Sequence, residues 1–368
     1  MKTRFTLITI LLALSIVLSA CASASPTQPP EIEEAEQSEE VAQEEVPVES
    51  EPEPTEEPTE EPAPEAVTLR VGAKCGPTAH VMPLFVVLSQ KGNEFDGLNI
   101  EYVPVTGPDQ MTALLSNGEV DILLSQIITP AKMYMAEIPI RLYSISMTKG
   151  FYLVAGEDIS SWEDLKGQRI LMPNPASGPS QLAFASMKEA GFDPEADFAI
   201  ENMPSSQIIQ LMVAGEAPAA VISEPQVTIV INKSKNQSDI SYKPAIDLYS
   251  VYESDLWEAG QLPLDGVSVV QNILDDEAST QALKTFVSAY NESIKFMLAN
   301  PEEASKLIGA QLSEHCDSKI NPMALQKTFD SGRLLYDPRP VVEFLPDIDS
   351  YIELVLGTEV DEGFYVQE

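Results

Sequence analysis

The sequence has few of the residues that build catalytic and metal sites. Its 368 residues include only two histidines, His80 and His315, and three cysteines. No closely spaced His/Cys cluster of the kind that holds zinc can be formed from so few. The chain also lacks a G-x-S-x-G elbow, a P-loop, a strand followed by G-x-G-x-x-G, and an H-E-x-x-H motif. These absences argue against an enzyme, and we expect neither a metal nor a cofactor.

Basic residues are also scarce. The chain has 21 Lys and Arg against 58 Asp and Glu, a formal net charge of −37. Binding to phosphates needs clusters of Lys and Arg, and none is present, so nucleic acid is not an expected partner. The acidity weakly favours a neutral or cationic small ligand. It does not exclude an anion, because the N-terminus of a helix can bind one locally.

The N-terminal apolar run, residues 5–18, is shorter than the roughly 20 residues that a transmembrane helix needs. Lys2 and Arg4 precede it, which is typical of a secretory signal. The run ends in LSAC, with Cys21 last, and this resembles a bacterial lipobox. Residues 1–20 are therefore predicted to be a lipoprotein signal peptide, with a lipid on Cys21 that anchors the protein to a membrane without spanning it. An ordinary signal peptide with a nearby cysteine is the alternative.

An acidic, proline-rich tract follows the cysteine. Residues 31–66 contain 16 glutamates and no Lys or Arg. Such a segment cannot bury enough apolar surface to offset the entropy lost on ordering, and its like charges keep it extended. We predict that residues 21–66, after the lipidated cysteine, are a disordered linker. An acidic docking tail is the alternative.

The two other cysteines, Cys75 and Cys316, can pair in an oxidising compartment. Two cysteines alone do not establish a disulfide, so the sequence leaves their state open.

From residue 67 on, short apolar runs alternate with helical patterns. This alternation predicts an α/β fold with parallel sheets. The expected strands are 67–73, 98–103, 120–125, 140–146, 169–172, 199–203, 219–222 and 267–271. The expected helices are 81–90, 109–116, 129–136, 180–190, 205–214, 227–236, 279–300, 301–311, 323–332 and 341–356.

The pattern occurs twice, which predicts two lobes that close like a hinged clamp. We expect residues 67–150 to form the first part of lobe 1, residues 151–265 to form lobe 2, and residues 266–368 to return to lobe 1 and add C-terminal helices. The folded region of about 300 residues is long enough for two cores.

Ligands of open α/β sheets bind beyond the carboxyl ends of the strands, and this rule selects four loops. Each loop is small and polar and is expected to begin a helix, where free N–H groups suit an anion or a carbonyl. N-caps and turns alone would also explain these residues. The candidate ligand-binding residues in the loops are Gly76, Pro77, Thr78 and His80 in loop one, Ser125 and Gln126 in loop two, Asn174, Ala176, Ser177 and Gly178 in loop three, and Glu224 in loop four.

Glu224 is the most specific of these candidates, because a carboxylate at a strand end can accept from a ligand N–H or ammonium group. A solvated turn acid is the alternative. Thr148 is a further candidate, since the stretch 148–150 is where the chain is expected first to cross between the lobes. Gly150 suits a hinge there.

Several stretches resemble extracytoplasmic solute-binding proteins of ABC importers, and more closely the SsuA/THI5-like (NMT1) family with the type II periplasmic binding fold. The matching stretches are RVGA at 70–73, GPT at 76–78, LLSNGEVDIL at 114–123, ISSWEDLKGQRI at 159–170, AGFDP at 190–194, LMVAGEAPAAV at 211–221 and NPEEA at 300–304. The similarity extends over nearly all of residues 67–368.

The resemblance implies a receptor that binds a small solute between its lobes and delivers it to a permease driven by an ATPase. It places the ligand loops at 76–78, 125–126 and 176–178. The family's solutes include sulfonates, nitrate, thiamine-precursor pyrimidines and riboflavin, and the lack of a basic residue in loops one to four favours a neutral heterocycle. We expect an extracytoplasmic, membrane-anchored monomer. A sensing or surface module on the same fold and, third, a pyrimidine-synthase-like enzyme are the alternatives.

Overall fold

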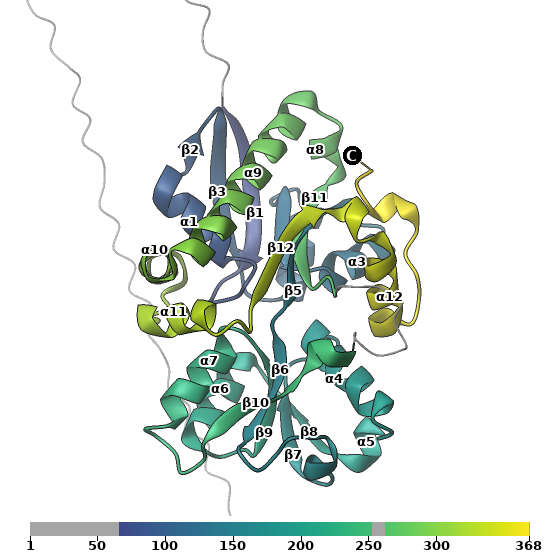
Figure 1. Ribbon diagram of the computed structural model, residues 1–368. Helices are drawn as coiled ribbons and strands as arrows, with labels where there is room; N and C mark the ends of the chain where they lie inside the picture. The colour runs from purple at the N-terminus through teal and green to yellow at the C-terminus, as the bar shows by residue number, and fades with distance from the viewer. Residues whose placement is uncertain (1–65, 252–261, 368) are drawn as a thin grey trace, which may run out of the picture. The chain divides into compact units, whose positions relative to one another are not determined.

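A computed structural model describes residues 66–251 and 262–367, and these form two β-sheets with helices on their faces (Figure 1). We call the seven-stranded sheet and its helices lobe 1, and the five-stranded sheet and its helices lobe 2. This confirms the expected two-lobed α/β class. The predicted signal peptide, the lipidated Cys21 and the acidic linker as far as residue 65 lie outside the described residues.

The sheet of lobe 1 uses strands from both ends of the folded region. Its order is β12 (Leu335–Pro340), β5 (Ile140–Lys149), β11 (Asp265–Val270), β4 (Ile122–Gln126), β1 (Val67–Lys74), β3 (Leu98–Val105) and β2 (Glu94–Phe95). The sheet of lobe 2 uses the middle of the chain. Its order is β10 (Tyr242–Asp247), β6 (Phe151–Gly156), β9 (Ala219–Ser223), β7 (Arg169–Met172) and β8 (Ala199–Asn202).

Both sheets are mixed, so the expectation of parallel sheets was wrong for four of the six strand pairs in lobe 1 and for two of the four in lobe 2. Strand β1 pairs in parallel with β3 and β4, and β7 pairs in parallel with β8 and β9. The antiparallel pairs are β11–β4, β11–β5, β12–β5, β2–β3, β6–β9 and β10–β6. The cause in lobe 1 is the crossing between lobes: β5 carries the chain out to lobe 2 and β11 brings it back, so the two neighbours run in opposite directions.

Helices cover both faces of the lobe 1 sheet. The helices of lobe 1 are α1 (Met82–Lys91), α2 (Pro108–Ser116), α3 (Ile128–Met135), α8 (Gln271–Leu274), α9 (Glu277–Ala299), α10 (Pro301–Cys316), α11 (Pro322–Asp330) and α12 (Leu345–Leu356). On one face, α9 packs against β1 and β3 and also against α1 and α8, and α1 packs against α10 (Figure 1). On the other face, α3 packs against β4 and β5 and against α12.

In lobe 2, α6 and α7 pack together and α4 lies against β6 and β9. Its helices are α4 (Gly178–Glu189), α5 (Pro194–Asp197), α6 (Ser205–Ala214) and α7 (Gln226–Ser234). Short 3₁₀ turns complete the chain at η1 (Glu163–Leu165), η2 (Leu248–Val251), η3 (Val341–Glu343) and η4 (Glu362–Phe364). None of the helices in the two described ranges combines the length and apolar character that crossing a membrane requires.

Strand β6 shows why lobe 2 needs helices on both faces of its sheet. All six of its residues are buried. Phe151, Leu153 and Ala155 join one apolar cluster, while Tyr152 and Val154 join another on the opposite face. Successive side chains of a strand point to opposite faces, so this continuous apolar run is a central strand covered on both sides.

Four strands, β2, β6, β10 and β12, were not among those expected from the sequence. Strand β2 has only two residues. Strand β6 has a continuous apolar pattern without alternation, and β10 and β12 contain Pro244, Pro338 and Pro340, which argue against a strand. Both proline-containing strands lie at sheet edges, where a missing N–H is tolerated. The other expected strands and helices are present with boundaries shifted by a few residues, except that residues 341–343 form η3 ahead of α12.

Candidate functional site

The four candidate loops lie where the strand-end rule places them. Loop one follows β1 and precedes α1, while the loop two residues Ser125 and Gln126 are the last two of β4, ahead of α3. Loops three and four follow β7 and β9 and precede α4 and α7. Because β1 pairs in parallel with β4, and β7 with β9, the loops of each lobe lie at the same edge of their sheet.

His80 of loop one is bonded at both ring nitrogens. Its Nδ1 lies 3.0 Å from Asp265 Oδ2, and its Nε2 lies 3.0 Å from Thr78 Oγ1. A carboxylate only accepts hydrogen bonds, so we assign a proton to Nδ1. Tyr290 from α9 donates its hydroxyl to the His80 carbonyl at 2.7 Å. Loop one is thus fixed against both β11 and α9.

Asp265 begins β11 at a central position in the sheet. Its Cα is the partner of Gln126 on β4 and of Met147 on β5. The residue is only 2% exposed, and while Oδ2 faces His80, Oδ1 has no hydrogen-bond partner among the described residues. Buried polar atoms are normally paired, so an unpaired carboxylate oxygen marks a place where a partner is missing.

One buried hydroxyl near this carboxylate shares that property. Tyr351 Oη on α12 has no hydrogen-bond partner within the described ranges, and the residue is fully buried. The Thr148 hydroxyl is also buried and unpaired among the described residues, but Thr148 follows Met147, the β5 partner of Asp265, so its side chain points to the other face of the sheet. Burial raises the pKa of the Tyr351 phenol, and the nearby Asp265 carboxylate raises it further, so the hydroxyl keeps its proton at neutral pH.

Loops two and three meet across the lobes. Gln126 Oε1 accepts a 3.3 Å hydrogen bond from the Gly178 N–H at the start of α4, and Lys132 Nζ donates to the Ala176 carbonyl at 2.8 Å. A Cβ on Gly178 would lie 2.8 Å from Tyr351 Oη. Only glycine lets the first turn of α4 approach lobe 1 this closely.

The other polar groups of loop three are used within the loop. Asn174 Oδ1 accepts from the Ala176 N–H at 2.8 Å, and Ser177 Oγ donates to Ser180 Oγ at 3.2 Å. These contacts are turn and helix-start interactions, which the sequence offered as the alternative to ligand binding.

Loop four forms a second contact between the lobes. Glu224 is 1% exposed, and its Oε1 lies 2.6 Å from Arg333 Nε and 3.0 Å from Thr228 Oγ1. Arg333 lies just before β12 and also donates to Thr228 Oγ1, while its carbonyl accepts from Tyr152 of lobe 2. Burial raises the pKa of the Glu224 carboxyl, and the Arg333 guanidinium opposes that rise.

The carboxylate that was expected to hold a ligand N–H therefore already has partners in Arg333 and Thr228. Contact between Glu224 and a solute stays a prediction.

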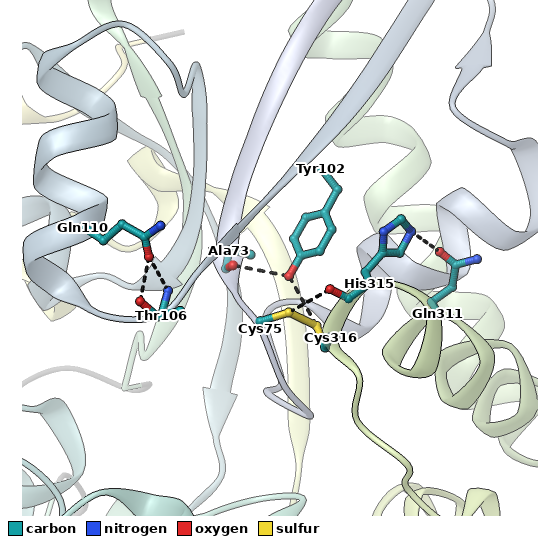
Figure 2. Close-up of a disulfide and its surroundings, with 8 residues drawn as sticks. All are labelled: Ala73, Cys75, Tyr102, Thr106, Gln110, Gln311, His315 and Cys316. Atoms are coloured by element: carbon teal, nitrogen blue, oxygen red, sulfur yellow. Dashed lines mark hydrogen bonds between the residues drawn. A yellow bond between two sulfur atoms is a disulfide. The ribbon is translucent and has the colours of Figure 1, made fainter. Parts of the chain in front are cut away.

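A disulfide joins the start of loop one to the end of α10. The S–S bond of Cys75 and Cys316 is 2.03 Å long, with the Cα atoms 5.5 Å apart (Figure 2). Beside it the His315 ring stacks on Phe85, with ring centroids 6.2 Å apart, and its Nε2 lies 3.1 Å from Gln311 Oε1. The second histidine thus belongs to the packing around the disulfide.

The structure brings only some of the sequence candidates together. The contacts above connect five candidates to one another or to the neighbouring lobe, namely Thr78, His80, Gln126, Ala176 and Gly178. Gly76 has a φ of +138° and open space where a Cβ would lie. Ser125 donates its hydroxyl to the Gln126 carbonyl. No group of three or more His, Cys, Asp or Glu in the described part of the chain is arranged to hold a metal.

Three residues of this region, Asp265, Tyr351 and Arg333, were not among the candidates chosen from the sequence. Asp265 is the single charge in the buried stretch 262–270, and that isolation was a usable signal. Tyr351 follows the apolar spacing of a helix and Arg333 follows a helix end, so neither pattern marks a site.

Residues 93–304 match the model of a family described as NMT1/THI5 like. Among solved structures, the chain is similar to an ABC transporter protein from Parabacteroides distasonis, with a TM-score of 0.61 and 20% identity over 82% of this chain and 99% of that one. The chain is also similar to the periplasmic aliphatic sulphonate-binding protein SsuA from Escherichia coli, with a TM-score of 0.62 and 15% identity over 83% of this chain and 93% of that one.

The periplasmic nitrate-binding protein NrtA from Synechocystis PCC 6803 gives a TM-score of 0.55 and 14% identity over 75% of this chain and 74% of that one. No curated protein matches the chain. At these identities the solved structures establish the shared two-lobed fold and leave the ligand open.

Proposed function

Because the chain belongs to the NMT1/THI5-like family, whose model matches residues 93–304, we propose that it is the solute-binding component of an ABC importer and not an enzyme. It captures a small solute between its lobes and delivers it to a permease and ATPase. Related folds that bind a sulphonate and nitrate support a solute-binding role.

The observation that carries this proposal is the contact of loops from both lobes around unpaired buried polar atoms. Gln126 of lobe 1 accepts from Gly178 of lobe 2, and the Cα partner of Gln126 is Asp265, which has an unpaired oxygen. A solute that contacts both lobes at once stabilises the closed arrangement over an open one.

We propose that the protein works outside the cytoplasm as a monomer anchored to a bacterial membrane by a lipid on Cys21. The support is the sequence LSAC after a short apolar run. Mass spectrometry of the N-terminal peptide should find a diacylglyceryl group on Cys21. A Cys21→Ser variant should leave the membrane fraction, and an unmodified wild-type Cys21 would contradict the anchor.

The proposed transport role is tested with the detergent-purified full chain and a thermal-shift screen. The panel contains sulfonates, nitrate, bicarbonate, thiamine-precursor pyrimidines, riboflavin and amino acids. A solute at 100 times its dissociation constant should add about 2.7 kcal/mol to the free energy of unfolding. If no solute shifts the melt, the supernatant of the denatured protein is analysed for a co-purified small molecule. Absence of both a shift and a co-purified molecule would contradict the proposal.

A further inference from the structure

The Asp265 carboxylate is the strongest constraint on what the interlobe site can bind. It is 2% exposed, and one of its oxygens is bonded to His80 while the other has no partner among the described residues. A buried carboxylate oxygen can be satisfied only by a hydrogen-bond donor, because an ionised carboxylate has no proton to give. Leaving it without one is costly.

The neighbouring unpaired Tyr351 hydroxyl imposes no such direction. It can donate or accept, so it adapts to whatever group faces it. The carboxylate therefore decides the chemistry of the solute, and the hydroxyl adds a second contact.

Three cations near the contacts between the lobes already have partners, and Lys74, which ends β1 just before loop one, is exposed. Lys132 donates to the Ala176 carbonyl, Lys149 pairs with Asp247 at 2.6 Å, and Arg333 pairs with Glu224 at 2.6 Å. The side-chain partner of Asp265 is His80, whose Nδ1 lies 3.0 Å from Oδ2. An anionic solute placed here would face a buried carboxylate without a dedicated counter-charge, and like charges in a low-dielectric site repel strongly.

We propose that the solute carries an N–H donor group, such as a protonated amine, an amidine or an amino-substituted ring, which hydrogen-bonds to Asp265 Oδ1. This inference rests on the proposed solute-binding function and narrows its solute class, since it disfavours simple sulfonates, nitrate and bicarbonate. The Asp265–His80 pair then has two tasks: Oδ2 fixes loop one, and Oδ1 receives the solute.

The test compares two sets of probes on the full chain in detergent. The donor set is ethanolamine, benzamidine, 4-aminopyrimidine and thiamine, and the anionic set is ethanesulfonate, nitrate and bicarbonate. At least one donor probe should raise the melting temperature and the anionic set should not. Binding of an anionic probe alone would overturn the solute class while leaving the transport function standing.

The role of Asp265 is tested with Asp265→Asn, which keeps the shape of the side chain and replaces an accepting oxygen by an amide. The dissociation constant for the bound donor probe should rise about 10- to 100-fold, the range expected when a hydrogen bond to a charged group is lost. The matched control is Asp275→Asn. Asp275 is exposed, lies beyond the end of β11 opposite to Asp265, and accepts a hydrogen bond from Gln271. The control should bind as the wild type does. An unchanged affinity in Asp265→Asn would overturn the proposal.

Two further measurements apply where the variant does not fold or no probe binds. If Asp265→Asn does not fold, the wild-type probe comparison decides alone. If no probe binds, the small molecule released from the denatured protein is identified by mass spectrometry. A solute with an N–H donor supports the proposal and one without it overturns the proposal. No released molecule at all contradicts the transport function itself.

Discussion

Arg333 Nε lies 2.6 Å from Oε1 of Glu224, and this ion pair joins residues 109 positions apart in the chain. The Glu224 side chain has no exposed area, while that of Arg333 is 24% exposed. The pair connects the segment before β12 in lobe 1 to the end of β9 in lobe 2, so it acts on both the stability and the relative position of the lobes.

Replacing Arg333 by alanine should destabilise the protein, because it leaves a buried carboxylate without its cation. The expected loss in the free energy of unfolding is about 2–4 kcal/mol, toward the lower end of the range for broken buried pairs because Arg333 itself is partly exposed. Urea denaturation measures it. Arg169→Ala is the matched control, since Arg169 pairs with Glu201 at the same 2.6 Å but at the surface, and it should cost below about 1 kcal/mol.

The Arg333→Ala loss should also depend on pH. Burial already raises the pKa of Glu224, and removing the guanidinium raises it further. The folded-state pKa of Glu224 then lies above the unfolded value of about 4.5. Its contribution to the free energy of unfolding is therefore fully present below that pH and is lost as the pH rises. The deficit should therefore be larger at pH 7.5 than at pH 5. Adding Glu224→Gln to Arg333→Ala should remove this pH dependence; its persistence in the double variant would assign it to another group.

Gly178→Ala should disturb the contact between α4 and lobe 1. An added Cβ would lie 2.8 Å from Tyr351 Oη and 3.1 Å from Gln126 Oε1. The gain in helix propensity is at most about 1 kcal/mol, whereas overpacking costs about 1–3 kcal/mol, so a net loss of stability is expected.

Thermal melts of the wild type and four variants test the Gly178 prediction. Tyr351→Phe removes the hydroxyl, so the double variant Gly178→Ala/Tyr351→Phe should recover part of the loss. Gly107→Ala is the control, because its Cβ would meet nothing within 4 Å. Strictly additive effects of the two substitutions would show that the Tyr351 hydroxyl is not the obstacle.

Removing the disulfide with Cys75→Ser/Cys316→Ser should lower the free energy of unfolding by about 2–5 kcal/mol, because the bond closes a long loop in the unfolded chain. The two cysteines are 241 residues apart. Urea denaturation with and without dithiothreitol measures this. The reductant should shift the wild type toward the variant and leave the variant unchanged. If the wild type is fully reduced, as alkylation of its free thiols would show, its stability should be lower. An unchanged stability in that state would contradict the expected contribution of the disulfide to the free energy of unfolding.

Stability should fall in alkaline solution because of buried tyrosines. Burial raises the pKa of Tyr290, Tyr336 and Tyr351 above their usual value of about 10. Above pH 10 the unfolded chain releases these protons and the folded chain keeps them, so each group costs about 1.4 kcal/mol per pH unit. Melts between pH 8 and 11 should show the loss, and Tyr351→Phe should make it less steep. An identical slope in that variant would exclude Tyr351 from the effect.

Much of the fold was predictable because short-range patterns determine it. The strand ends, the helix starts at loops one to four and the repeated unit follow from local spacing of apolar and turn residues. Strand direction was not predictable in the same way. Whether β5 runs parallel or antiparallel to β11 depends on where the chain crosses between the lobes, which no local pattern encodes.

The site was predictable only in part for a related reason. His80 and Gln126 could be proposed because they lie near the ends of strands. Their contacts depend on Asp265 and on Gly178, which are distant in sequence. Glu224 could be selected from the sequence as a carboxylate at a strand end, but its burial and its ion pair could not be foreseen. Its counter-charge, Arg333, lies in a turn whose sequence has no feature that distinguishes it.

The Cys75–Cys316 bond also has a consequence for the chain after proteolytic damage. All five strands of lobe 2 lie between the two cysteines in sequence. A single cut by a protease anywhere in that interval leaves both fragments covalently attached, so the nicked protein keeps its full mass until a reductant is added. At the location proposed above, outside the cytoplasm, proteases are present and thiols are scarce, and there one broken peptide bond need not release either lobe.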